Sequence, residues 1–160
     1  MELFSNPGTT FRSGYDLLKN LPGGSYLFSR LIGLAAPYSA TIDARLVELS
    51  PGYAKVEMAD RRAVRNHLDC VHAVALANLA ELTTGAAMTY GMPDGTRGIL
   101  AGLSIEYVKK ARGKLTAICH CSPPATAEKR HYDVVAKIFD QQGELVAQGT
   151  AKWLIGPSLQ

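Results

Sequence analysis

The sequence predicts an α+β fold in which one long helix packs against an antiparallel sheet. Two features predict it: a single apolar stretch long enough for a buried helix, and short runs with strand character on both sides of it. Two such runs precede the helix and four follow it, with turn-forming residues between them. Strands joined by short turns favour antiparallel pairing, so we expect one sheet with the helix across one face.

The chain of 160 residues has the length of one domain. We expect residues 1–37 to form a helical extension ahead of a domain at residues 38–160. Glycine and proline divide this extension into two helices, predicted at Tyr15–Leu21 and Tyr26–Ala35. Ser25 stands where the N-cap of the second helix is expected. The apolar side chains of the second helix can either cover the sheet or roof an acyl site, and covering the sheet is the simpler role.

Six strands are expected on the two sides of the long helix. Pro51-Gly52 predicts a hairpin between the first two strands, and Gln141-Gln142-Gly143 predicts another between the last two. Arg112-Gly113 and Pro123-Pro124 are turn signals between the middle strands. The strands are expected at Ala40–Ser50, Tyr53–Met58, Ile99–Lys109, Lys114–Cys121, His131–Asp140 and Leu145–Ile155.

The long helix is predicted between Val71 and Pro93, in a segment rich in alanine and leucine that Gly91 and Pro93 bring to an end. It is apolar on nearly all sides, so it needs burial on most of them. Glu81 is its only charged residue. Burial raises the pKa of a carboxyl group toward neutrality, where the group can act as a general base. The alternative is a structural carboxylate at a wet helix face, or one paired with Arg or Lys in a subunit interface.

The residues around the start of this helix resemble a known family. Asn66, His72 six positions later and Glu81 nine positions after that are similar to the signature of the phenylacetyl-CoA-type acyl-CoA thioesterases. Residues 103–113 also resemble the strand and turn that follow the helix in that family. The resemblance implies a hotdog fold over about residues 40–156, in which a six-stranded antiparallel sheet wraps around a long central helix.

The resemblance also implies that the protein hydrolyses an acyl-CoA thioester to a free acid and CoA. Glu81 would activate the attacking water, Asn66 would hold the water or the carbonyl, and the backbone N–H of Ala73 would polarise that carbonyl. The sequence departs from the family in two places. Ala73 and Val74 stand where Gly-Gly is usual, and Leu100 lies near the position of an expected Ser or Thr.

His72 and Glu81 cannot act together within one chain. Nine helical positions separate them, which is roughly 13 Å along the axis, and they lie on opposite faces. A two-fold dimer can bring Glu81 of one chain to the helix start of the other. The family resemblance implies such a shared site, so we expect a homodimer or a dimer of dimers. His72 itself is expected to have a structural role, with its side chain donating hydrogen bonds to the preceding loop.

Further residues are candidates for substrate binding. Asn78 and Thr84 lie three positions on either side of Glu81, so they are expected on its face of the helix. The same polar stripe can instead be a solvated dimer seam, and Asn66 can instead be a helix cap. The cations expected to contact the phosphates of CoA are Lys110, Arg112 and Arg130.

Composition and charge exclude several other classes of protein. A net charge of +3 is too small to indicate nucleic acid, and three cysteines without framework spacing indicate a reducing compartment. The histidines and cysteines lack the spacing of a zinc site, so we expect no metal and no cofactor. No stretch has the pattern of a secretory signal or a membrane span. We therefore expect a cytoplasmic protein that binds neither membrane nor nucleic acid.

Two other functions stay open. Hotdog acyl dehydratases have a His fourteen positions before a helical Glu, as His67 precedes Glu81, but their Pro-rich loop ending in Pro-Gly is missing here. A non-catalytic acyl-CoA-binding protein would keep the fold without turnover, and Ala73-Val74 in place of Gly-Gly motivates that alternative.

Overall fold

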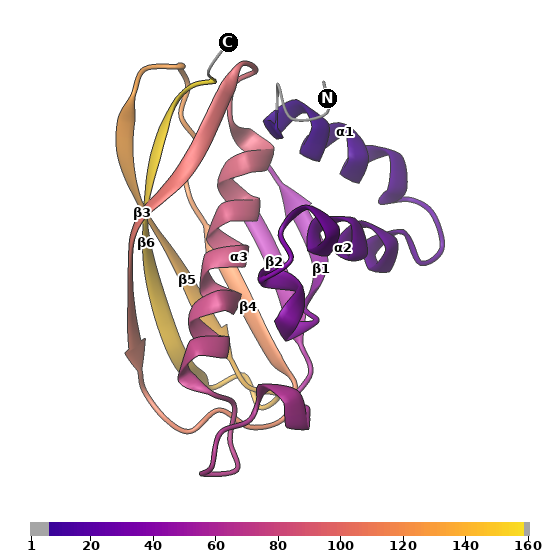
Figure 1. Cartoon of the computed structure of the whole chain (residues 1–160), viewed down its shortest axis with the longest axis vertical. Coiled ribbons are helices and arrows are strands. Elements are labelled where there is room, and N and C mark those ends of the chain that lie inside the picture. Colours follow the sequence, from indigo (N-terminus) through magenta and orange to yellow (C-terminus); the bar gives the residue numbers. More distant parts are fainter. Residues whose placement is uncertain (1–6, 159–160) are drawn as a thin grey trace.

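The long helix α3 (Ala73–Gly91) lies along one face of a six-stranded antiparallel sheet, with two shorter helices beside it (Figure 1). The structure is a computed structural model that describes residues 7–158. Residues 1–6 of the expected extension and 159–160 of the expected domain therefore lie outside it. α3 contacts all six strands, and α1 and η2 pack against it as well. The predicted α+β architecture is confirmed.

The elements follow one another in the predicted order. The helices are α1 (Pro7–Leu18), α2 (Gly24–Ala35) and α3, with the short 3-10 helices η2 (Ser39–Ile42) and η3 (Arg62–Val64). The strands are β1 (Arg45–Ser50), β2 (Tyr53–Met58), β3 (Thr96–Tyr107), β4 (Leu115–His120), β5 (Arg130–Phe139) and β6 (Leu145–Pro157). The long helix and all strands except the first agree with their predicted bounds to within three residues.

The first strand is shorter than predicted. The expected strand began at Ala40, but this residue lies in η2, and β1 begins only at Arg45. The cause is Asp43, which has a left-handed backbone with φ of 49°, a conformation that an extended strand does not allow. The N–H of Asp43 donates to the carbonyl oxygen of Ala40 at 3.0 Å and closes η2. The chain therefore turns between α2 and the sheet before the strand starts.

The strand order is β1-β2-β4-β5-β6-β3, so β3 and β4 follow each other in the chain without being neighbours. The turn signal at Arg112-Gly113 therefore joins two separated strands and does not form a hairpin. β3 pairs along β6, from Thr96 opposite Pro157 to Tyr107 opposite Ala147. β1 and β3 are the two edges, and each has one neighbouring strand within the described residues.

The first helix lies earlier in the chain than predicted, because contacts with distant residues fix it. The expected helix was Tyr15–Leu21, whereas α1 runs from Pro7 to Leu18. Arg12 in α1 donates hydrogen bonds to the carbonyl oxygens of Tyr90 and Met92, at 3.1 Å each, where α3 ends. These bonds satisfy carbonyl groups that a helix end leaves without partners.

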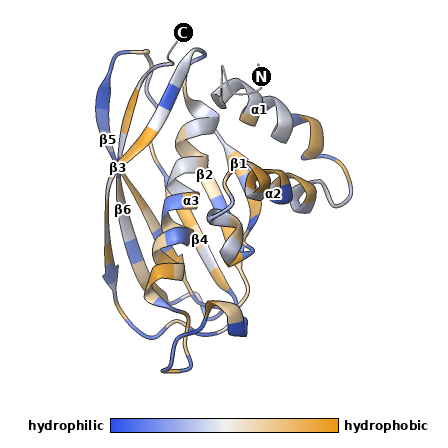
Figure 2. Cartoon of the chain, viewed as in Figure 1, coloured by the Kyte–Doolittle hydropathy of each residue, from blue (hydrophilic) through white to orange (hydrophobic). Residues whose placement is uncertain are grey.

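α2 starts close to its predicted position but without the predicted cap. Gly23 precedes it with a left-handed φ of 74°, and the Ser25 hydroxyl donates instead to the carbonyl oxygen of Leu46. On the inner side of α2, Phe28 meets Tyr15 edge to face, with ring centroids 5.3 Å apart. α2 thus packs on α1 and β1. Its outer side is also rich in hydrophobic residues (Figure 2).

Small residues let α3 lie close to β6. A Cβ atom placed on Gly149 would lie 2.5 Å from the Cβ of Ala80. Farther along α3, the indole Nε1 of Trp153 donates to the hydroxyl of Thr84 at 3.2 Å. These contacts fix α3 on the sheet and with it the position of Glu81. None of the described helices combines the length and apolar character that crossing a bilayer requires.

Candidate functional site

The start of α3 is the first part of the candidate site. His72 is the N-cap, and its ring Nδ1 accepts a hydrogen bond from the backbone N–H of Val74 at 3.0 Å. The backbone N–H of His72 donates to the carbonyl oxygen of Val64 at 2.8 Å and fixes the preceding loop. His72 therefore has a structural contact, as expected. The expected direction was wrong, because the ring accepts a hydrogen bond from the helix and, within residues 7–158, donates none to the loop.

Ala73 is the first residue of α3, and no group within residues 7–158 accepts a hydrogen bond from its backbone N–H. First-turn amides of this kind carry the positive end of the helix dipole. The carbonyl oxygen of Ala73 accepts from the Tyr107 hydroxyl at 3.0 Å, which ties the helix start to the end of β3. The amide is thus held in place and can polarise a carbonyl oxygen.

Asn66 lies in the loop before α3, where its side chain organises a turn. Its Oδ1 accepts from the N–H of Leu68 at 2.9 Å and from the N–H of Cys70 at 3.4 Å. Its backbone N–H donates to the carbonyl oxygen of Cys70 at 2.9 Å. Asn66 therefore shapes this loop and is not the cap of α3. Its Nδ2 has no acceptor in the described part of the chain and can donate to a substrate oxygen.

Glu81 lies on the less buried side of α3, together with Val74, Ala77 and Gly85. It is itself half-buried, and this burial raises the pKa of its carboxyl group, as the sequence predicts. Among residues 7–158, no Arg or Lys forms an ion pair with it, and no group donates to its carboxylate. Residues 7–158 of the same chain therefore supply no partner, and the alternative of a pair with Arg or Lys in a subunit interface stays a prediction.

A helix-start cavity of about 180 Å³ opens beside the first turns of α3. Asn78 lies in its wall, and its Nδ2 donates to the carbonyl oxygen of Tyr38 at 3.2 Å and to Thr41 Oγ1 at 3.5 Å. The buried Asn78 thus holds η2 against α3. The cavity is lined by Tyr38, Thr41, Ile42, Ala63, Val64, Arg65, His72, Val74, Ala75 and Asn78.

Thr84 is not brought to this cavity. It is fully buried between α3 and the sheet, and its hydroxyl donates to the carbonyl oxygen of Glu81 at 3.0 Å. The same hydroxyl accepts from Trp153 Nε1. The polar side chains around Glu81 therefore do not form a solvated stripe, because Thr84 and Asn78 both face the interior.

The three candidate phosphate contacts are not close together within one chain. Arg112 Nε donates to the carbonyl oxygen of Asp69 at 3.0 Å, which places it beside the loop of Asn66. Lys110 is exposed in the same turn. Arg130 begins β5, whose far end pairs with the start of β4 after that turn. A strand of this length places Arg130 roughly 30 Å away.

Sequence reasoning missed the wall that η2 and the following loops contribute to the helix-start cavity. Tyr38, Thr41 and Arg65 come from separate segments, and no spacing in the sequence connects them. Arg65 forms ion pairs with Asp60 at 2.7 Å and Asp69 at 2.8 Å. Within residues 7–158, no three His, Cys, Asp or Glu side chains gather as a metal site would require.

Solved structures share this architecture over most of their length. A structural genomics target, APC5556, is 31% identical, with a TM-score of 0.80 over 92% of this chain and 98% of that one. PA5026 from Pseudomonas aeruginosa, described as a probable thioesterase, is 22% identical, with a TM-score of 0.73 over 86% and 97%. A putative thioesterase of Ralstonia eutropha JMP134, related to phenylacetic acid degradation, is 19% identical, with a TM-score of 0.64 over 74% and 89%.

These likenesses define the class of the protein: it has the hotdog fold that the sequence resemblance implied. The chain belongs to the family described as domain of unknown function DUF4442, whose model matches residues 24–155. No curated protein sequence matches it. The family match spans α2 as well as the sheet and α3, so α2 is part of what the family shares.

Proposed function

We propose that the protein hydrolyses an acyl-CoA thioester to a free acid and CoA. The observation that carries the proposal is Glu81, a half-buried carboxylate with a raised pKa and no partner among the described residues. An unpaired carboxyl in such a position destabilises the fold, and groups of this kind cluster at functional sites. The fold shared with proteins described as thioesterases supports the same class of reaction.

In the proposed reaction, Glu81 takes a proton from a water molecule whose oxygen attacks the thioester carbonyl carbon. Negative charge develops on the carbonyl oxygen. The free N–H of Ala73 and the Nδ2 of Asn66 stabilise that charge. The C–S bond then breaks, and the leaving thiolate takes up the proton from Glu81. The products are a free acid and CoA, and the carboxylate is regenerated.

The proposed site is shared between two chains, and the geometry of α3 supports this. Eight helical positions separate Ala73 from Glu81, which is roughly 12 Å, too far for both to act on one carbonyl. A second copy related by a two-fold axis can supply the missing carboxylate, in a homodimer or in a dimer of dimers. The unpaired edge of β3 supports such pairing, because large apolar side chains are exposed along it and just beyond it. These residues are Ile99, Leu103, Tyr107 and Val108.

Lys110 and Arg112 are the proposed contacts for the CoA phosphates. Both lie in the turn after β3, and Arg112 is bound to the loop that carries Asn66. Two neighbouring cations in that turn, Lys109 and Lys114, are engaged in ion pairs with acidic side chains. Lys110 has no ion pair within the described residues, so its ammonium group is available for a phosphate.

Thiol release across short, medium, long and aromatic acyl-CoAs tests the proposed function. Glu81→Gln keeps the shape and removes the base, so turnover should fall by about two to four decades. Calorimetry should show nearly unchanged acyl-CoA binding, because CoA is recognised elsewhere. Glu128→Gln, at an exposed glutamate on a loop, is the matched control and should keep full activity. Wild-type turnover in Glu81→Gln would return Glu81 to a purely structural role.

One observation favours a second candidate, an acyl-CoA-binding protein without turnover. The backbone N–H of Val74, a first-turn amide, is already occupied by His72. This leaves fewer donors for a developing oxyanion than an uncapped helix start would offer. A calorimetric signal with acyl-CoA but no thiol release would select this candidate. Hydration of crotonyl-CoA without thiol release would instead select the dehydratase chemistry in which His67 takes part.

A further inference from the structure

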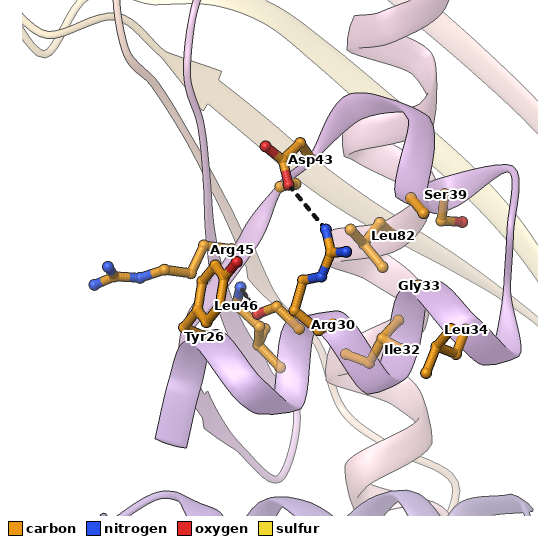
Figure 3. A pocket seen from close by; sticks show the side chains of 13 residues that line it. Tyr26, Arg30, Ile32, Gly33, Leu34, Ser39, Asp43, Arg45, Leu46 and Leu82 are labelled. Atoms are coloured by element: carbon orange, nitrogen blue, oxygen red, sulfur yellow. Dashed lines mark hydrogen bonds and ion pairs between the residues drawn. The ribbon is translucent and has the colours of Figure 1, made fainter. Parts of the chain in front are cut away.

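A second cavity, here called the α2 cavity, lies between α2, η2, the start of β1 and α3 (Figure 3). Its volume is about 260 Å³, slightly below the range of about 300–1,000 Å³ that holds drug-sized ligands. Most of its wall is apolar, with Ile32 and Leu34 from α2, Ala44 and Leu46 from the β1 side, and Leu82 from α3. This size and lining suit a short aliphatic chain or a single aromatic ring.

The polar groups of Ser29, Arg30 and Asp43 in the α2 cavity have partners within the chain. The Ser29 hydroxyl donates to the carbonyl oxygen of Ser25 at 2.7 Å and accepts from the N–H of Leu46 at 2.9 Å. Arg30 reaches across the opening toward Asp43, in an ion pair of 3.9 Å whose two side chains are both more than half exposed (Figure 3). Such an exposed pair is weak and can open. The interior therefore favours an apolar guest.

The two cavities follow each other along one face of α3. Val74, Asn78 and Leu82 are spaced by four residues, so they share that face one turn apart. Val74 and Asn78 line the helix-start cavity, and Leu82 lines the α2 cavity. η2 separates the two, with Thr41 in the wall of the first and Ala40 in the wall of the second. Leu82 also follows Glu81 directly in the chain.

We propose that the α2 cavity receives the acyl group of the substrate, so that α2 and η2 set which acyl groups are accepted. The inference rests on the proposed function, because it names the part of the thioester that this cavity takes. The expected substrate class is an acyl-CoA with a short aliphatic or single-ring aromatic acyl group. α2 is then a specificity element and more than a cover for the sheet.

Substitutions on opposite walls that change the size of the α2 cavity test whether it receives the acyl group. Leu82→Phe and Ala44→Leu narrow it, and Leu82→Ala widens it. kcat/KM is measured by thiol release from butanoyl-, hexanoyl-, decanoyl- and benzoyl-CoA. Both narrowing variants should lower kcat/KM for the largest accepted acyl group, relative to the smallest, by about tenfold, the lower end of the effect of one missing or excess methylene in an apolar pocket. Leu82→Ala should shift the preference toward larger groups.

Leu31→Phe is the matched control, because Leu31 is exposed on α2 and does not line the cavity. Its acyl preference should equal that of the wild type. Thermal melting confirms that each variant is folded, and variants on two walls keep the test valid if one of them does not fold. An unchanged acyl preference in all folded cavity variants, with turnover intact, would overturn the acyl site and leave the proposed hydrolysis standing.

Binding distinguishes the failure of this inference from the failure of the proposed function. If the wild type releases no thiol, calorimetry with hexanoyl-CoA, decanoyl-CoA and CoA itself shows whether the α2 cavity still binds the acyl group. Weaker binding of the acylated ligands by Leu82→Phe, with unchanged binding of CoA, supports the acyl site without catalysis. The proposed acyl site is overturned if wild type and Leu82→Phe bind all three ligands with equal affinity. It is also overturned if the wild type binds none of them.

Discussion

The ring Nδ1 of His72 lies 3.0 Å from the backbone nitrogen of Val74 and accepts its hydrogen bond. Through this contact, His72, which belongs to the motif that resembles the thioesterase signature, caps the helix. The neighbouring N–H of Ala73 has no acceptor within residues 7–158. One donor of the helix start thus stabilises the fold, and the other is the one that we propose contacts the substrate.

His72→Ala should therefore lower stability and change catalysis little. Loss of an N-cap costs about 0.5–2 kcal/mol, which urea or thermal unfolding will detect. His72→Asn should restore most of that stability, because Asn is among the best N-cap residues. Thiol release should stay within a few fold of wild type in both variants at a temperature where they are folded. A loss of several decades in the folded His72→Asn variant would show that the imidazole takes part in the reaction.

Glu81→Gln should make the protein more stable at neutral pH. The folded-state pKa of Glu81 is raised, so its contribution to stability is fully present below the unfolded-state pKa, where the group is protonated in both states. That contribution is lost as pH rises through the folded-state pKa and a charge forms in a half-buried position. The melting temperature of Glu81→Gln should exceed that of wild type by a few degrees at pH 7–8, since about 1 kcal/mol shifts it by about 2–4 °C.

The difference in melting temperature between Glu81→Gln and wild type should disappear as the pH falls toward the unfolded-state pKa of a glutamate. Glu128→Gln is the control, because Glu128 is exposed and should show the same melting temperature as wild type throughout. A wild-type protein that melts above Glu81→Gln at neutral pH would show that the carboxylate has a stabilising partner. In a dimer, that partner would come from the second copy.

Thr84→Val should destabilise the fold more than Thr83→Val. Thr84 accepts the hydrogen bond of Trp153 Nε1, so its removal leaves a largely buried donor without a partner. This costs about 1–3 kcal/mol. Thr83 is equally buried, but its hydroxyl only donates to the carbonyl oxygen of Leu79 in the same helix, so its loss orphans no donor. Urea unfolding of both variants tests this, and equal losses would show that Trp153 finds another acceptor.

The local patterns of the sequence predict the elements well, and contacts between distant elements explain the misses. The composition of its segment, with Gly91 and Pro93, predicts α3, and the lack of any other charge in that segment distinguishes Glu81 as a candidate functional residue. The edge position of β3 depends on pairing with β6, about fifty residues later. The α2 cavity could not be predicted, because its walls come from four separate elements.

The edge of β3 offers a direct test of the dimer. Leu103→Lys places a charge at an exposed apolar position on the unpaired edge strand, where lysine opposes pairing between strands. Analytical ultracentrifugation at micromolar concentration should show a dimer or larger assembly for wild type and a shift toward monomer for Leu103→Lys. Leu21→Lys, at an exposed leucine before α2, is the control and should leave the assembly unchanged. A strictly monomeric wild type would remove both the dimer and the shared site.

The final prediction concerns which chains build one site. Asn66→Ala and Glu81→Gln should each be nearly inactive alone. If the site is shared, a heterodimer of the two has both lesions in one site and leaves the other intact. Statistical exchange should then restore up to about a quarter of wild-type activity, since half of the dimers are mixed and one of their two sites works.

Recovery indicates a shared site, because a site built within one chain would carry one lesion in each centre of the mixed dimer and leave neither intact. The doubly substituted chain, paired with wild type in a purified and tagged heterodimer, completes the test. A shared site leaves neither centre whole, because each then lacks either Asn66 or Glu81. A site built within one chain leaves the wild-type centre intact, with about half of full activity. Appreciable turnover in that heterodimer would therefore rule out the shared site.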